Sequence, residues 1–305
     1  MPFRGSLSRA LLAVALGAAV AAAGGLGAGA SVRSPWEMHR PSNPRRTGAF
    51  ENPKLIESSG VAASSRQPGI LWTLNDSGNE PLIFATDTLG RDRGAFRVVG
   101  AENEDWEAIS LGPCGTGECL YIADTGDNLE RRASARLYRV PEPSLSSTAR
   151  STRRAEALDL RYPGGPRDVE TAFVGSDGTV YLISKGRDGV VQAYRVPASA
   201  WTGTEFLAAP IGTLPIETGD LGALVTDAAL HPSGELVAVR TYRAIFLFRL
   251  AAGHTLRPLG VGCETAGLQL QGEGISWFDH EELVLTSEAG FGSPGTIVLL
   301  RCHAP

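Results

Sequence analysis

The feature that most constrains this chain is an internal repeat of about 50 residues, a period that is typical of propellers and other arrays. Each unit opens with an acidic residue followed by a small and then an apolar residue, except that the first unit has a serine in the acidic position. The five copies begin at Ser59, Glu107, Glu170, Asp227 and Glu273. One such repeat cannot bury its apolar face alone, so the units are expected to pack against one another.

Further landmarks recur in the same order inside the units. A turn and an apolar strand follow the acidic triplet, and a third strand ends in pairs such as Tyr138-Arg139 and Tyr194-Arg195. Short fourth strands follow in four of the units. This order predicts an all-β fold, a single β-propeller of five blades, with six as the alternative if residues 197–225 hide a merged unit. We expect an N-terminal strand, placed at residues 53–56, to complete the last blade and close the ring.

The N-terminal segment predicts export. Two arginines precede the apolar run at residues 10–23, and small residues at 28–30 suit a signal peptidase. We therefore expect a signal peptide at residues 1–30, a disordered spacer at 31–49 and the propeller domain at 50–305, in a secreted or extracytoplasmic protein. An uncleaved anchor is the alternative, although the run is short for a membrane span.

Composition and charge agree with one turn-rich domain and exclude one class of partner. The 305 residues include 37 Gly and 19 Pro, which suits many short strands. The net charge is −5 and the body of the chain has no basic cluster, which argues against nucleic acid as a partner. We expect a monomer with no membrane contact after signal cleavage.

The four cysteines support the same compartment. Because their number is even in a chain with an export signal, two disulfides are expected. Pairing Cys114 with Cys119 would join one hairpin, and pairing Cys263 with Cys302 would tie the closing blade to its neighbour. Four cysteines allow three connectivities, so the sequence leaves the pairing open. Zinc is not expected, because no CxxC spacing is present.

The candidate site follows from propeller geometry, which brings the start of each inner strand and the end of each second strand to one end of the axis. The acidic landmarks should converge there with residues of the second-strand loops. The candidate metal ligands are Glu107, Asp124, Asp127, Glu170, Asp227 and Glu273. The candidate ligand-binding residues are Asn75, Asp76, Lys185, Arg240 and Glu288.

Two interpretations of the acidic ring stay open. Carboxylates near one axis repel each other, and a bound cation would relieve that repulsion; oxygen ligands favour Ca²⁺, then Mg²⁺ or Mn²⁺. Alternatively, each acidic residue accepts hydrogen bonds from backbone N–H groups of the next blade and locks the blades together. The loops that begin at Asp76 and Asp124 also read as ordinary turns.

Several segments resemble a group of secreted propeller proteins of high-GC bacteria. They are SGVAAS at 59–64, LWTLNDSG at 71–78, DWEAI at 105–109, DTGDN at 124–128 and YRVP at 138–141. More distantly, the chain is similar to esterase-like phytases and strictosidine-synthase-like propellers. That resemblance implies a calcium-bearing acidic cluster at the mouth of the channel.

Three functions are compatible with these patterns. The first is a secreted Ca²⁺-binding propeller that recognises a small or polymeric ligand at the channel mouth. The second is a metal-dependent hydrolase of phosphate or carboxylic esters, with Glu107, Glu170 or Glu273 as general base. A glycosidase is a variant of the second, because it also needs paired carboxylates. The third is a scaffold for a partner protein.

Overall fold

The computed structural model describes residues 34–303, and residues 35 onward form one compact unit. The predicted signal peptide and its cleavage site lie outside the described residues. In the part of the chain that is described, no helix is long and apolar enough to cross a membrane.

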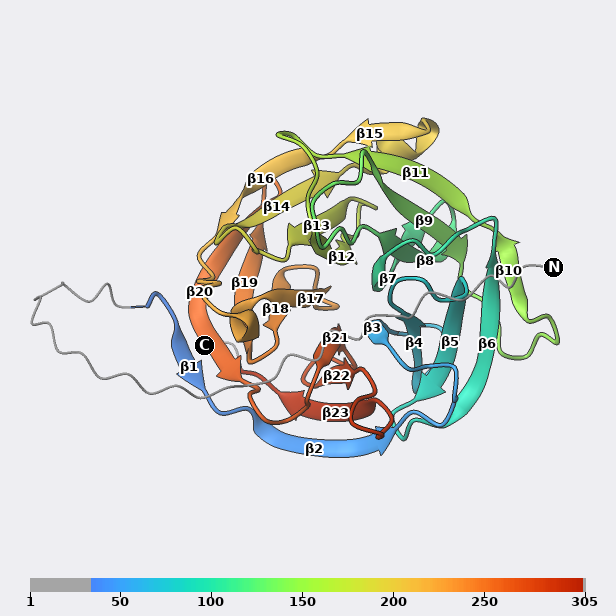
Figure 1. The fold of residues 1–305 in the computed structure, drawn as a ribbon, viewed down its shortest axis with the longest axis horizontal. Helices are drawn as coiled ribbons and strands as arrows, with labels where there is room; N and C mark the ends of the chain where they lie inside the picture. The colour runs from blue at the N-terminus through green and yellow to red at the C-terminus, as the bar shows by residue number, and fades with distance from the viewer. Residues whose placement is uncertain (1–33, 304–305) are drawn as a thin grey trace, which may run out of the picture. The chain divides into compact units, whose positions relative to one another are not determined.

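Residues 34–303 form five sheets arranged around a central axis (Figure 1). Each sheet is one blade, with strands ordered from the axis outward. Blade 1 holds β3 (Ser58–Ala63), β4 (Ile70–Asn75), β5 (Leu82–Asp87) and β6 (Asp92–Val99). Blade 2 holds β7 (Trp106–Cys114), β8 (Gly117–Asp124), β9 (Ala135–Pro141) and β11 (Glu156–Arg161). Blade 3 holds β12 (Val169–Val174), β13 (Val180–Ser184), β14 (Val191–Val196) and β16 (Ala209–Leu214).

Blade 4 holds β17 (Val225–Leu230), β18 (Leu236–Thr241), β19 (Ala244–Ala251) and β20 (Thr255–Glu264). Blade 5 holds β21 (Gly272–Trp277), β22 (Leu283–Ser287), β23 (Thr296–Arg301) and β2 (Ser42–Ala49). Three short strands add parallel outer edges: β10 (Ser151–Arg154) on β6, β15 (Glu205–Leu207) on β11 and β1 (Glu37–His39) on β20. The described residues also contain two short 3-10 helices, at Ala198–Thr202 and Leu221–Ala223. The all-β, five-bladed prediction is confirmed.

The N-terminal strand closes the ring, but it is not the segment that the sequence suggested. Strand β2 pairs antiparallel with β23, with Arg45 opposite Leu299. Residues 42–49 were expected in a disordered spacer, and this expectation is wrong. Residues 53–56 form no strand. Each inner strand also contacts the next one around the axis, so the ring is continuous from β3 through β7, β12, β17 and β21 back to β3.

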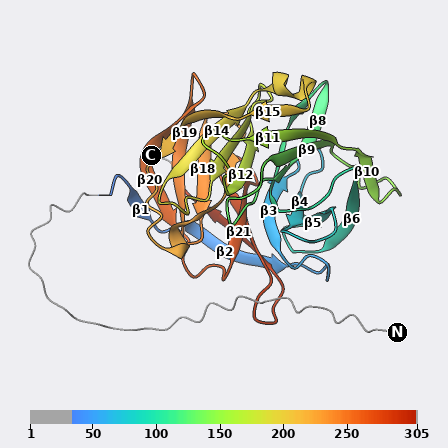
Figure 2. The same ribbon diagram turned by 45° about the horizontal axis from the view of Figure 1, so that its top comes forward.

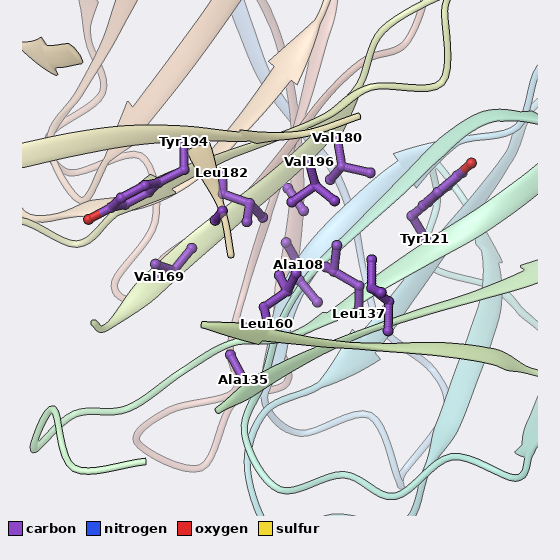
Figure 3. Packing of buried hydrophobic residues seen from close by; sticks show 14 of the residues in the cluster. Ala108, Tyr121, Ala135, Leu137, Leu160, Val169, Val180, Leu182, Tyr194 and Val196 are labelled. Carbon is purple, nitrogen blue, oxygen red and sulfur yellow. The ribbon is translucent and has the colours of Figure 1, made fainter. Parts of the chain in front are cut away.

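The core lies between neighbouring blades. Figure 3 shows the cluster between blades 2 and 3, where Leu137 and Leu160 face Leu182 and Val196. All four side chains are fully buried. Burying one such side chain contributes about 1.5–3 kcal/mol, and the same arrangement recurs between the other blades.

Both predicted disulfides are present. Cys114–Cys119 joins the β7–β8 hairpin. Cys263–Cys302 links the end of β20 in blade 4 to the residue that follows β23 in blade 5. The second bond spans 39 residues and connects the two blades that are furthest along the chain. It therefore ties down the blade that the N-terminal strand must complete.

Candidate functional site

Each inner strand begins with a β-bulge that leaves one or two of its residues unpaired with the second strand. In blade 2, Trp106 and Ala108 pair with consecutive residues of β8, so Glu107 has no partner opposite it. Bulges re-aim side chains and are frequent beside functional sites. The equivalent bulges occur at Ser59-Gly60, Glu170, Thr226 and Glu273-Gly274. The acidic landmark of the sequence therefore marks a bulge in three of the five blades.

In blade 4 the sequence pattern placed the landmark at Asp227, one residue after the bulged position. The bulged residue is Thr226, whose hydroxyl donates to the Glu273 carbonyl at 3.0 Å, as the Ser59 hydroxyl donates to the Glu107 carbonyl at 2.7 Å. The Asp227 carboxylate instead accepts from the backbone N–H groups of Ala228 at 2.8 Å and Ile275 at 2.9 Å. Since Ile275 belongs to the next blade, Asp227 joins blades 4 and 5.

Five carboxyl groups come together beside the axis, from blades 1, 2 and 3. They form two groups that share Glu107, and within each group one oxygen from each residue lies within 4.8 Å of the others. The first group is Asp76, Asp105 and Glu107, and the second is Glu107, Asp168 and Glu170. The other candidate metal ligands, Asp124, Asp127, Asp227 and Glu273, belong to neither group.

Asp105 and Asp168 were missed at the sequence level, although a signal for them exists. Each precedes a landmark glutamate by two residues, in Asp105-Trp106-Glu107 and Asp168-Val169-Glu170. The intervening residue pairs with the second strand, so the Asp and the bulged Glu flank one point of the ladder. That repeated spacing could have identified both aspartates.

Burial and mutual repulsion hold these carboxyl groups toward their neutral form. Burial, reinforced by Asp76, raises the pKa of Asp105 to about 8, and burial also raises the pKa of Glu170 to about 8 against the opposing charge of Lys185. For Glu107, burial and then Glu170 raise the pKa well above its usual range. A bound cation would stabilise such a site, because its charge offsets the repulsion among the ionised carboxylates.

Lys185 supplies one of two positive charges within this cluster. Its ammonium group lies 2.5 Å from a Glu170 carboxylate oxygen, and both residues are buried. Burial acts to lower the pKa of Lys185, but Glu170 and Glu107 raise it more strongly, so the group stays protonated. Arg187 adds a second positive charge, because its Nε pairs with the Asp168 carboxylate at 2.5 Å. Among the described residues, three of the five carboxylates (Asp76, Asp105 and Glu107) form no ion pair, which leaves room for a further cation.

Blade 5 brings further acidic side chains to the axis, and they belong to neither group. Burial raises the pKa of Glu273 to about 8, with Lys185 opposing, and raises that of Glu288 to about 7. Tyr242, which follows β18 as Lys185 follows β13, interacts with Glu273 and was not predicted. Gln271 donates to the Glu288 carboxylate at 2.8 Å.

Three predicted site residues fix the loops that carry the acidic groups. The Asn75 amide oxygen accepts from the backbone N–H groups of Ile56 and Glu57, at 3.1 and 3.0 Å. Asp124 occupies the same place at the end of β8 and accepts from the N–H of Asp105 at 3.0 Å. The backbone N–H of Asp127 donates to the Asp168 carboxylate at 3.0 Å. These contacts position the acidic side chains.

Arg240 points across an interface between blades. Its guanidinium donates to the carbonyl groups of Gly274 at 2.6 Å and Thr286 at 2.9 Å, and to the Gln269 side chain at 2.7 Å. All three acceptors lie in or just before blade 5. Of the candidate ligand-binding residues, Asp76 and Lys185 therefore lie in the acidic cluster, Glu288 lies nearby, and Asn75 and Arg240 bind the protein itself.

No protein-family profile matches the chain, and no curated protein matches it in sequence. Among solved structures it is similar to a PQQ-bound aldose sugar dehydrogenase from Streptomyces coelicolor, with 12% identity, a TM-score of 0.51 and coverage of 87% of this chain and 100% of that one. It is also similar to the α-L-arabinofuranosidase PaAbf62A from Podospora anserina in complex with cellotriose, with 9% identity, a TM-score of 0.50 and coverage of 86% and 96%. Identities this low show the fold alone, a distant similarity between propellers.

Proposed function

We propose that this protein is a cation-binding β-propeller that recognises a ligand at the acidic end of its axis, and that the cation is Ca²⁺. One observation carries the proposal: the Oδ1 atom of the Asp105 carboxylate is buried and has no hydrogen-bond partner among residues 34–303. The same residue belongs to a group of three carboxylates that could hold an ion. An unpartnered buried oxygen costs about 1–3 kcal/mol unless a ligand satisfies it.

The donor set suits a hard cation. Both groups consist of carboxylates, and Ca²⁺ takes six to eight oxygen ligands, whereas Mg²⁺ demands a stricter octahedron and keeps more of its water. Asp76 and Asp105 lie in loops rather than within strands, so their side chains suit the less rigid Ca²⁺ geometry. When bound, the cation would neutralise the repulsion among the carboxylates and offer open coordination positions to oxygen atoms of a ligand.

The rim of the same end supports ligand recognition. Large apolar side chains are exposed there, in loops that precede inner strands or follow second strands. They are Ile56, Leu129, Val190, Leu221, Leu270 and Phe291, which range from 41% to 94% exposed. Phe291 lies on the β22–β23 loop, which projects beyond the blades in Figure 2. These side chains are accessible to a ligand that binds at this end of the axis.

Export is part of the proposal. The two disulfides are stable in an oxidising compartment, and they agree with the signal peptide expected at residues 1–30. We further propose that the protein acts as a monomer and that nucleic acid is not its ligand.

Calcium should stabilise the folded protein through these carboxylates. In thermal unfolding after chelation, Ca²⁺ at a hundredfold excess over its dissociation constant should add about 2.7 kcal/mol, a shift of several degrees. Asp105→Asn and Glu107→Gln should abolish the shift. Glu273→Gln, a buried axial control outside both groups, should keep it. A parent protein whose melting temperature ignores calcium would refute the cation site.

A second test narrows the space around the carboxylates without replacing any candidate metal-ligating residue. A Cβ added at Gly126 would lie 2.3 Å from Glu107 Oε1 and 2.6 Å from Asp105 Cγ. Gly126→Ala should therefore displace both side chains and weaken Ca²⁺ binding by about 10- to 100-fold, as changes around metal ligands typically do. Gly219→Ala on the same face, where a Cβ meets nothing within 4 Å, is the control and should bind as the parent does. Calorimetric titration with Ca²⁺ measures both, and equal affinities would place the cation elsewhere.

Hydrolysis of an ester is the second candidate function, and it is favoured by the buried Glu170–Lys185 pair next to the proposed cation. A bound cation would lower the pKa of a water, and a carboxylate of this cluster could accept its proton. A screen with chromogenic phosphate and carboxylic esters tests it. Turnover that needs Ca²⁺ and disappears in Glu170→Gln, with the fold retained, would establish the hydrolase.

A further inference from the structure

The second carboxylate group, Glu107, Asp168 and Glu170, already holds a cation that belongs to the chain itself. The Lys185 ammonium lies 2.5 Å from Glu170 Oε1. The side chain of Lys185 is 10% exposed and that of Glu170 is 1% exposed, so little water separates or screens the pair. An ammonium is a compact point charge that only donates, and it therefore occupies a carboxylate group much as a metal ion would.

The oxygen atoms of Asp168, in the same group, also have partners. Its Oδ1 accepts from the backbone N–H of Asp127 at 3.0 Å, and its Oδ2 accepts from the Arg187 guanidinium at 2.5 Å. Asp168 is 1% exposed. A metal ion in this group would have to approach two positive side chains and compete with them for the same buried oxygen atoms.

The first group, Asp76, Asp105 and Glu107, is different. None of its three members forms an ion pair with another residue in the described part of the chain, and Asp105 Oδ1 is buried without any hydrogen-bond partner there. Asp105 is 9% exposed and Glu107 is 4% exposed. The unbalanced negative charge of the cluster is therefore concentrated in the first group.

The repeat explains how one cluster contains both kinds of group. Lys185 is the first residue after β13 in blade 3, and Asp76 is the first residue after β4 in blade 1 (Figure 1). The same repeat position thus provides a carboxylate to one group and an ammonium to the other. The backbone of Lys185 is fixed as well, because its N–H donates to the Asp168 carbonyl at 2.9 Å and its carbonyl accepts from the Val225 N–H at 3.1 Å.

The charges of the cluster limit the number of metal ions that it can take. Five ionised carboxylates, less one ammonium and one guanidinium, leave three negative charges. One divalent ion reduces this to a single negative charge, whereas a second would leave an unbalanced positive charge in a buried site, which is costly. Without the ammonium the cluster would carry four negative charges, which two divalent ions would balance.

We propose that Lys185 is an internal counterion that fills the second group and limits the protein to one metal ion, bound by the first group. The inference rests on the proposed cation site and gives that site its position and its stoichiometry. Lys185 is then a specificity-determining residue. Its removal should open a second metal site at the second group, with Glu107, which belongs to both groups, between the two ions.

Counting bound Ca²⁺ tests the inference on the mature protein. After chelation, calorimetric titration and equilibrium dialysis should give one Ca²⁺ per chain for the parent and two for Lys185→Met, whose side chain is unbranched but uncharged. The variant leaves Glu170 buried without its partner. It should therefore melt below the parent in chelator, and saturating Ca²⁺ should raise its melting temperature more than that of the parent.

Two controls separate the second group from a general loss of positive charge. Lys185→Met combined with Glu170→Gln removes the carboxylate together with the ammonium, and it should bind one Ca²⁺ as the parent does. Lys54→Met removes a lysine whose side chain is 62% exposed and pairs with Glu80 on the surface. It should also bind one Ca²⁺, with the affinity of the parent.

The outcomes distinguish this inference from the proposed function. Two ions in the parent, or one in Lys185→Met, would overturn the inference and leave the cation site in place. A Lys185→Met protein that stayed unfolded in saturating Ca²⁺ would overturn it too, because no ion would have replaced the ammonium. No ion in the parent but one in Lys185→Met would overturn the proposed calcium site and confirm Lys185 as the counterion of the second group. No ion in either protein would overturn both.

Discussion

Replacing Arg240 by methionine should lower the free energy of unfolding by about 3–5 kcal/mol, because two buried carbonyl groups lose their donor at a cost of about 1–3 kcal/mol each. The side chain is 1% exposed, and burial lowers its pKa to about 10, so it is still protonated at neutral pH. Methionine would leave the carbonyl groups of Gly274 and Thr286 without this donor. Gly274 lies in the bulge of β21, where the ladder is interrupted.

Arg243→Met is the matched control, because Arg243 lies in the same blade, two residues after the end of β18. Its side chain is 53% exposed and pairs with Asp220, so its loss should change stability by no more than about 0.5 kcal/mol. Chemical denaturation of both variants measures the difference. If Arg240→Met unfolded at the same denaturant concentration as the parent, the contacts between blades 4 and 5 would contribute little and Arg240 would be free to serve a ligand.

The sequence predicted the number of blades and most of their strands because each unit repeats the same order of turn, apolar strand and aromatic–arginine ending. It failed at the closing strand for a physical reason. Residues 42–49 form an outer strand with a largely polar sequence and several half-exposed side chains, and its pairing with β23 is set by tertiary structure. A short polar edge strand cannot be distinguished from a spacer by composition.

The sequence pattern placed the acidic landmarks at one end of the axis, and the structure shows that they do not all occupy the bulged position of their strand. A bulge adds one residue to a strand, and alternation alone does not reveal which residue is added. In blade 4, Asp227 matched the acidic pattern while Thr226 took the bulged position. A one-residue shift of the same kind distinguishes Asp124 from Asp76. Asp124 fixes a loop, whereas Asp76 belongs to the carboxylate group with Asp105 and Glu107.

Two proposed roles for the acidic ring are thus divided among its members. Asp227 accepts backbone hydrogen bonds from its own strand and from the next blade, as the blade-locking interpretation requires. Glu107 and Glu170 gather with three aspartates, as the cation interpretation requires. Repeated residues need not repeat their role, because the partners that each bulge meets differ from blade to blade.

In the presence of chelator, stability should fall by several kcal/mol between about pH 5 and pH 8, since each pKa unit corresponds to about 1.4 kcal/mol. Asp105, Glu170 and Glu273 each have a pKa of about 8 in the folded protein, with burial as the largest cause. In the unfolded chain, aspartate and glutamate ionise near pH 4. The folded state therefore holds more protons throughout this window, unfolding releases them, and stability decreases as pH rises.

Calcium should remove most of that decrease, because a bound cation favours the ionised carboxylates and its affinity increases as they lose their protons. Asp105→Asn imitates the neutral form of one group and should flatten the profile of the chelated protein, whereas Glu264→Gln, at an exposed carboxylate, should leave it unchanged. Denaturant unfolding of the parent and both variants at successive pH values, with and without Ca²⁺, measures these profiles. Stability that stays level or rises toward pH 8 in chelator would show that Lys185 and the neighbouring arginines already compensate the carboxylates, and the physical case for a cation at this site would be lost.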